Sequence, residues 1–198
     1  AADLTAAGGA ITLDNAANDF QDGVTAHAGL ALSLADTDGI TLADVDTANG
    51  AIAVTAGGLI TATDVAGLTD NDANDITLTG VGIAVGSVAA GVGAAADVTL
   101  DAGTGAITDL QADTVTPDAD GFSVPDGVRT VNLVADQLAM KADGNIGASG
   151  DPLDITVNTV AAASTAGGLY LLESDALQVG AVGDLTGITT DLGIQVET

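Results

Sequence analysis

Cysteine and tryptophan are absent from this 198-residue sequence, and only Phe20, Phe122 and Tyr170 carry an aromatic ring. Without cysteine the chain forms no disulfides, so stability has to come from the backbone and from aliphatic packing. A compact globular core is usually filled with large rings, whereas a narrow interior of stacked strands has room only for aliphatic side chains. Because hydrophobic residues still make up 47% of the chain, the composition favours an ordered, narrow interior.

Positive charge is also scarce, since Arg129 and Lys141 stand against 28 acidic residues and leave a net charge of −26. Binding to nucleic acid needs cations that neutralise phosphates, so nucleic acid is excluded as a partner and an anionic membrane surface is disfavoured. Glutamate is rare too, and the acidity comes from aspartate, which favours turns. The resulting self-repulsion would be relieved by salt or divalent cations, which suits an extracellular setting.

Long apolar helices are missing as well. The longest charge-free window, residues 76–96, is interrupted by five glycines and is too weakly hydrophobic and too poorly helical for a membrane span. No signal peptide is recognisable at residues 1–4, so we expect a mature product or an excised segment.

Short alternating runs are what the sequence does contain, most clearly in residues 18–65. Apolar residues occupy every second position at 30–34, 40–42 and 52–55, which is the period of a half-buried strand. Turn-forming residues rich in Asp, Asn and Gly separate these runs at 36–39, 46–50 and 57–58. A unit this short cannot bury its own apolar face, so we expect copies to stack on one another.

Apolar pairs recur at intervals of 20 to 24 residues, at Ile11/Leu13, Leu32/Leu34, Ile52/Val54, Ile76/Leu78 and Val98/Leu100. That interval suits one turn of a three-sided solenoid. We therefore predict an all-β fold in which residues 1–198 form a single continuous β-solenoid of roughly nine coils, a rod roughly 40–45 Å long at the spacing between paired strands.

The middle of the chain departs from this pattern. Residues 113–127 hold two of the three prolines, which cannot donate to a strand ladder, so we expect a loop excursion outside the coils. Residues 128–134 resume strand alternation, and residues 135–142 are the one passage predicted to make a helical turn or two. Strand patterns return at 153–157, 167–172, 176–182 and 193–196.

Three passages carry a family likeness: residues 11–20 (ITLDNAANDF), residues 50–61 (GAIAVTAGGLIT), and residues 168–171 followed by 175–180. They resemble repeats of filamentous-haemagglutinin-like adhesins, very large bacterial exoproteins exported by two-partner secretion or as autotransporters. The resemblance covers most of residues 8–65 and 150–198, and it implies a right-handed parallel β-helix that forms a long stalk. It is a likeness of repeats rather than of a catalytic motif, and the family's secretion-domain motifs are not recognisable, which favours a mid-stalk piece.

Aspartates two residues apart in flexible turns offer the hard oxygen ligands that calcium prefers. The candidate calcium ligands are Asp36, Asp38, Asp70, Asp72, Asp75, Asp118 and Asp120. None of these turns extends to an EF-hand loop, which needs a bidentate glutamate at its twelfth position, and the GGxGxD repeat of calcium-binding β-rolls is missing. The alternative interpretation is that they are simply solvated turns.

Acids and bases gather at one place, formed by Asp126, Arg129, Asp136 and Lys141. Some β-helix enzymes cleave polysaccharides with such groups, but two cations would hardly neutralise an anionic sugar, and a local ion pair explains the grouping equally well. We therefore expect no enzyme activity and no required cofactor, with Ca²⁺ as a candidate ligand. His27 has no cysteine nearby, so we interpret it as an exposed strand or turn residue.

Together these patterns predict a structural and adhesive stalk segment of a giant secreted bacterial surface protein, of the kind found in extracellular fibres and biofilms. Its partners would be other copies or neighbouring repeats stacked end to end, and a host-cell or matrix surface. The alternative from another class is a calcium-dependent carbohydrate-binding module whose binding loop is the 113–127 excursion. A third hypothesis is a β-helix polysaccharide lyase or hydrolase.

Overall fold

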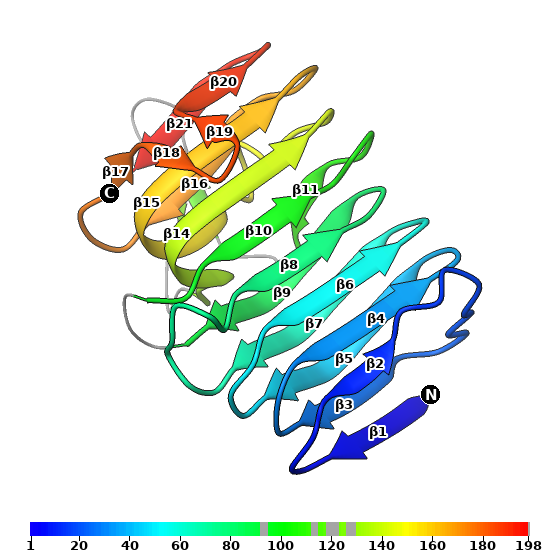
Figure 1. Cartoon of the computed structure of the whole chain (residues 1–198). Coiled ribbons are helices and arrows are strands. Elements are labelled where there is room, and N and C mark those ends of the chain that lie inside the picture. Colours follow the sequence, from blue (N-terminus) through cyan, green and yellow to red (C-terminus); the bar gives the residue numbers. More distant parts are fainter. Residues whose placement is uncertain (92–94, 112–114, 118–122, 126–129, 198) are drawn as a thin grey trace.

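The structure is a computed structural model that describes residues 1–91, 95–111, 115–117, 123–125 and 130–197. In that part of the chain every regular element is a strand, and 17 of the strands belong to one sheet. The strands follow one another along a single axis from β1 at one end to β20 and β21 at the other (Figure 1). Because neighbouring strands of this sheet pair in parallel, the predicted all-β class and parallel β-helix architecture are confirmed.

One side of the solenoid, called here the β2 face, is a ladder of eight layers. Its strands are β2 (Ile11–Leu13), β4 (Leu32–Asp36), β6 (Ile52–Ala56), β8 (Ile76–Thr79), β10 (Val98–Asp101), the second halves of β14 (Leu133–Ala142) and β15 (Leu153–Ser164), and β20 (Ile188–Thr190). The five apolar pairs that set the period stack directly in the first five layers. Eight layers replace the predicted nine, because the long connections around residues 112–131 and 174–187 lengthen two of the turns.

Two further ladders close the coil. The β1 face contains β1 (Ala2–Ala6), β3 (Val24–Ala28), the second halves of β5 (Ile40–Thr47), β7 (Ile60–Gly67) and β9 (Ile83–Ala90), and the first parts of β14 and β15. The β11 face contains the first halves of β5, β7 and β9, then β11 (Ile107–Asp109), an isolated bridge at Ile146, β16 (Leu169–Glu173) and β21 (Ile194–Glu197). β17 (Gln178–Val179) also pairs with β15.

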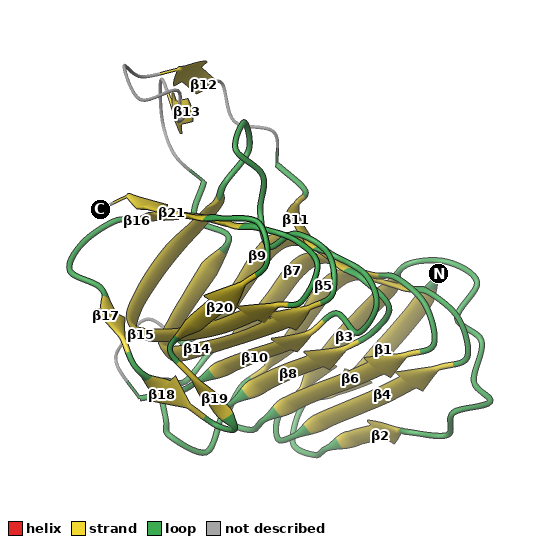
Figure 2. Ribbon diagram, turned by 90° about the horizontal axis from the view of Figure 1, so that it is seen from above, coloured by secondary structure: helices red, strands yellow, loops and turns green. Residues whose placement is uncertain are grey.

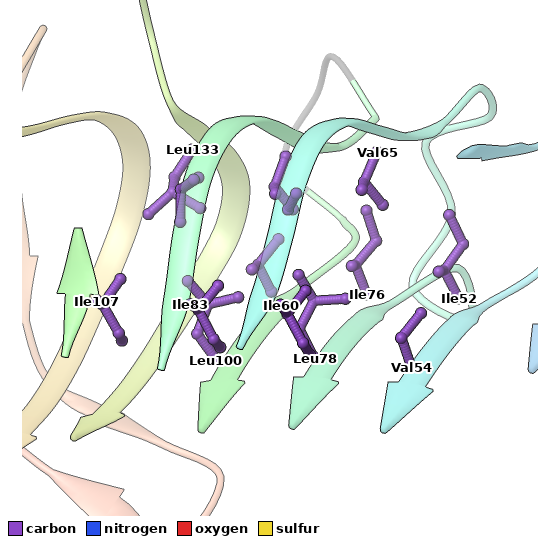
Figure 3. Packing of buried hydrophobic residues seen from close by; sticks show 14 of the residues in the cluster. Ile52, Val54, Ile60, Val65, Ile76, Leu78, Ile83, Leu100, Ile107 and Leu133 are labelled. Atoms are coloured by element: carbon purple, nitrogen blue, oxygen red, sulfur yellow. The ribbon is translucent and has the colours of Figure 1, made fainter. Parts of the chain in front are cut away.

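Aliphatic side chains from all three faces fill the interior in columns that follow the axis (Figure 3). Side chains at equivalent positions of successive turns stack on one another, as Ile40, Ile60, Ile83, Ile107, Ile146 and Leu169 do on the β11 face. Each of these six side chains is at most 1% exposed. Burying such a side chain contributes about 1.5–3 kcal/mol, so the columns carry most of the stability, as the aromatic-poor composition indicates.

Glycines at the corners allow successive turns to approach closely. A Cβ atom at Gly57 would lie 2.2 Å from the carbonyl oxygen of Thr37, and one at Gly50 would lie 2.3 Å from the amide nitrogen of Ala31. A larger residue at either place would therefore push two turns apart. Both glycines lie in segments that the sequence predicts as turns, and the structure shows why glycine stands there.

The helical expectation for residues 135–142 is wrong, because these residues form the second half of β14. They pair with β10 on one side and β15 on the other, and Leu138 and Met140 are fully buried in the interior. Gln, Leu, Met and Lys are good helix formers, but this weak local preference is overridden by two strand ladders and by the buried apolar face.

The predicted 113–127 excursion contains β12 (Val115–Pro117) and β13 (Ser123–Pro125), which pair antiparallel as a separate two-stranded sheet. Figure 2 shows these two strands apart from the stacked ladders. A second small hairpin, β18 (Ala181–Val182) with β19 (Leu185–Thr186), lies near β14 and β15. The extra chain length in these two turns is thus used for antiparallel hairpins outside the main sheet.

A buried asparagine links three turns at the corner before β14. The Asn132 side chain is fully buried; its Nδ2 donates to the carboxylate of Asp109 at 2.8 Å, and its Oδ1 accepts from the Asp154 amide at 2.8 Å. Nδ2 also lies 3.3 and 3.2 Å from the carbonyl oxygens of Val85 and Gly86. Since a buried polar group is costly unless it is hydrogen-bonded, this residue both requires and fixes the register of the turns around it.

Candidate functional sites

Two of the seven predicted calcium ligands lie together at the end of β4. Asp36 is 4% exposed, and its carboxylate accepts hydrogen bonds from the amides of Phe20 at 2.7 Å and Asp38 at 3.0 Å. Asp19, on the preceding turn, completes a group in which one oxygen from each carboxylate of Asp19, Asp36 and Asp38 lies within 4.8 Å of the others. Sequence reasoning missed Asp19, because its proximity depends on the stacking of turns.

The protonation of this group reflects the crowding of its charges. A hydrogen bond with Asp36, followed by desolvation and the nearby charge of Asp19, raises the pKa of the Asp38 carboxyl. Three carboxylates this close repel one another, and either a shared proton or a bound cation relieves the repulsion. The group can therefore offer calcium three oxygen ligands, with water filling the other positions.

The other predicted calcium ligands have different surroundings. Asp70 accepts hydrogen bonds from the amides of Ala95 and Ala96 at 3.2 and 3.3 Å, and Asp75 accepts one from the Asp97 amide at 3.0 Å. Asp72 is exposed, and within the described part of the chain neither it nor its two neighbours belongs to a group of three close ligands. These aspartates cap one turn with the next. Asp118 and Asp120 lie outside the described residues.

His27 has a charged environment that the sequence did not reveal. It lies on β3 directly beside Asp46 of β5, and its Nδ1 is 2.7 Å from the Asp46 carboxylate. The hydrogen bond to Asp46, together with the charges of Asp46, Asp44 and Asp3, raises the pKa of the imidazole. The signal was the spacing of 19 residues, close to one turn, between His27 and Asp46.

The predicted grouping of acids and bases is only partly described. Asp126 and Arg129 lie outside the described residues. Asp136 accepts a hydrogen bond from the Asn158 side chain at 2.9 Å, whereas Lys141 lies 3.3 Å from the Asp101 carboxylate on the neighbouring strand. Asp136 and Lys141 thus have separate partners, and the Lys141 pair is exposed, where such pairs contribute about 0–1 kcal/mol.

A groove of about 460 Å³ lies on the outside of the β2 face, between β10, β14 and the β18–β19 hairpin. It is lined by Thr99, Leu100, Asp101, Ala139, Lys141, Val182, Gly183, Asp184 and Leu185. The hairpin packs through Val182 and Leu185 on the small side chains of Ala139 and Ala161. Sequence reasoning missed this site, because its two walls come from segments about 40 residues or more apart along the chain.

Comparisons with protein-family models, with curated proteins and with solved structures found no match for this chain. Among the described residues, no helix is long and apolar enough to cross a membrane. The window 76–96, which the sequence analysis rejected as a membrane span, contains strands β8 and β9.

Proposed function

We propose that this chain is a structural and adhesive stalk segment of a large secreted bacterial surface protein, and that copies or neighbouring repeats stack end to end. The observation that carries the proposal is the continuous parallel ladder on all three faces, filled by unbroken aliphatic columns. This construction serves to make a stiff rod whose cross-section repeats. The likeness of residues 8–65 and 150–198 to adhesin repeats, described above, supports the extracellular setting.

The outermost strands suit such stacking. Among the described strands, β1 pairs only with β3 and β21 only with β16, so each has one unpaired edge. An unpaired edge is a template for another strand, and Leu4 of β1 points inward against the core while Thr5 is exposed. Since the net charge is −26, stacking brings like charges together and should strengthen with salt.

Electron microscopy and sedimentation of the purified chain test this proposal. We expect rods that lengthen with protein and salt concentration in steps of about 38 Å, the height of eight layers. Leu4→Lys places a charge on the inner side of the edge strand and should leave single rods, whereas the control Thr5→Lys adds the same charge outside and should still stack. A wild-type chain that stays a single short particle under all these conditions contradicts end-to-end stacking.

A second candidate function is a calcium-dependent, carbohydrate-binding module, and the carboxylates of Asp19, Asp36 and Asp38 favour its calcium component. Calorimetry with CaCl₂ should show binding that Asp38→Asn weakens and that Asp72→Asn leaves unchanged, because Asp72 lies outside that group. Absence of heat, together with a melting temperature that chelator does not shift, would rule this candidate out.

A further inference from the structure

The groove beside the β18–β19 hairpin has the features of a built site. Both ends of the hairpin are tied to β15, because the Gly180 amide donates to the Val160 carbonyl at 3.0 Å and the Ala162 amide donates to the Gly187 carbonyl at 3.0 Å. From these anchors the hairpin extends over β14, and its tip residues Gly183 and Asp184 face Thr99 and Asp101 of β10 across the groove. The hairpin is therefore an arch held at both ends.

The walls of the groove combine apolar and polar surface. Val182, Leu185 and Ala139 provide apolar contact on the hairpin side. On the other side lie the Thr99 hydroxyl, which donates and accepts hydrogen bonds, the Lys141 ammonium, which donates, and the Asp101 carboxylate, which accepts. A volume of about 460 Å³ is within the usual size range of small-ligand sites, which pair apolar surface with a few placed polar groups.

Charge and backbone pairing narrow the choice of ligand. Asp101 and Asp184 outnumber Lys141 in the lining, and the whole chain is strongly acidic, so anionic sugars and phosphates are repelled. An added peptide strand has no free edge here, because the backbones of β10 and β14 already pair with each other and with β8 and β15. A neutral polyhydroxylated chain matches the remaining features, since its hydroxyls can both donate and accept while its C–H faces pack on apolar walls.

We propose that this groove binds a neutral oligosaccharide and is the adhesive surface of the segment. The inference rests on the adhesive function proposed above and moves the predicted binding surface from the 113–127 excursion to the β18–β19 arch. In the bound state Lys141 and Asp101 would exchange their exposed pairing for hydrogen bonds to sugar hydroxyls, while Val182 and Leu185 cover the C–H face of the ring.

The test uses the full chain and a panel of hexasaccharides of glucose, mannose, galactose and N-acetylglucosamine, with a hexagalacturonate as the anionic probe. Calorimetry should detect binding of at least one neutral hexasaccharide and none of the hexagalacturonate. Thr99→Tyr fills the groove and should weaken the neutral ligand about tenfold or more, as should Lys141→Met, which removes a charged hydrogen-bond donor. Thr108→Tyr is the matched control, because Thr108 is an exposed threonine on the β11 face and should bind as the wild type does.

Binding of no neutral probe, or binding that neither groove variant changes, overturns the proposal. Two variants are used because Lys141→Met leaves the packing of the hairpin on Ala139 untouched even if Thr99→Tyr disturbs the fold. Sedimentation of the same variants separates the two proposals. Intact rods without sugar binding refute the groove alone, whereas sugar binding without rods refutes the stacked stalk alone.

Discussion

Replacing Asn132 by alanine tests whether buried polar links hold the turns in register. The change removes the side-chain partner of the Asp154 amide and one donor to the Asp109 carboxylate. The carbonyls of Val85 and Gly86 keep other partners, since they also accept from the Leu110 amide and the Gln111 side chain. The cost therefore comes mainly from the Asp154 amide and from Asp109, at about 1–3 kcal/mol for each group deprived of a buried bond.

We accordingly expect Asn132→Ala to lower the free energy of unfolding by about 2–4 kcal/mol. Urea unfolding followed by circular dichroism measures the loss, and hydrogen exchange should show the Asp154 amide losing protection first. Asn158→Ala is the matched control, because its bond to Asp136 is exposed and should be worth well under 1 kcal/mol. If both variants lose the same small amount, the reasoning is refuted.

Asn132→Asp sharpens the same test. A carboxylate still accepts from the Asp154 amide but repels Asp109 and the nearby carbonyl oxygens, so its pKa should rise. An acid with a raised folded pKa contributes stability that is present at low pH and lost as the pH rises through that pKa. The variant should therefore be relatively more stable at acid pH than at pH 7, and an equal deficit at both would contradict this account.

Three further predictions follow from the packing and the charges. Leu78→Ala in the central stack should cost about 2–5 kcal/mol in urea unfolding, whereas Leu68→Ala, at a side chain 62% exposed, should cost little; equal losses would argue against the aliphatic columns. The single imidazole of His27 should titrate above its ordinary pKa in an NMR titration and return toward it in Asp46→Asn; the small stability it adds is present below pH 6.5 and lost above it. Burial raises the pKa of Glu173, so its contribution is also lost as the pH rises, and Glu173→Gln should flatten the fall of the urea midpoint between acid and neutral pH; an unchanged slope would contradict it.

Periodicity made the repeating part of the fold predictable. Two-residue alternation marks the strands, and the interval of 20 to 24 residues marks the turn of the solenoid, so the pairs from Ile11/Leu13 to Val98/Leu100 stack as predicted. The same reasoning failed at residues 135–142, where helix-forming residues are held in β14 by neighbours on both sides. The number of layers was also beyond it, because hairpins inserted into two turns look like further repeats.

The candidate sites were less accessible to sequence reasoning. Paired aspartates identified Asp36 and Asp38, but their third partner Asp19, the contact between His27 and Asp46, and the two walls of the groove all join different turns. A difference of one or two residues in the length of a loop decides which side chains of adjacent turns meet. Such contacts cannot be derived from local patterns, because loop length varies from turn to turn.

The sequence by itself determined the class of the fold, the aliphatic nature of the core, and the exclusion of nucleic acid as a partner. These properties follow from composition and local period, which act on every turn alike. Only the tertiary structure decided the register, and with it the buried link at Asn132, the cluster around Asp36, and the arch over β14. The physical reason is that each of these depends on one turn lying on another, and the alignment of two turns is settled by the packing of the whole stack.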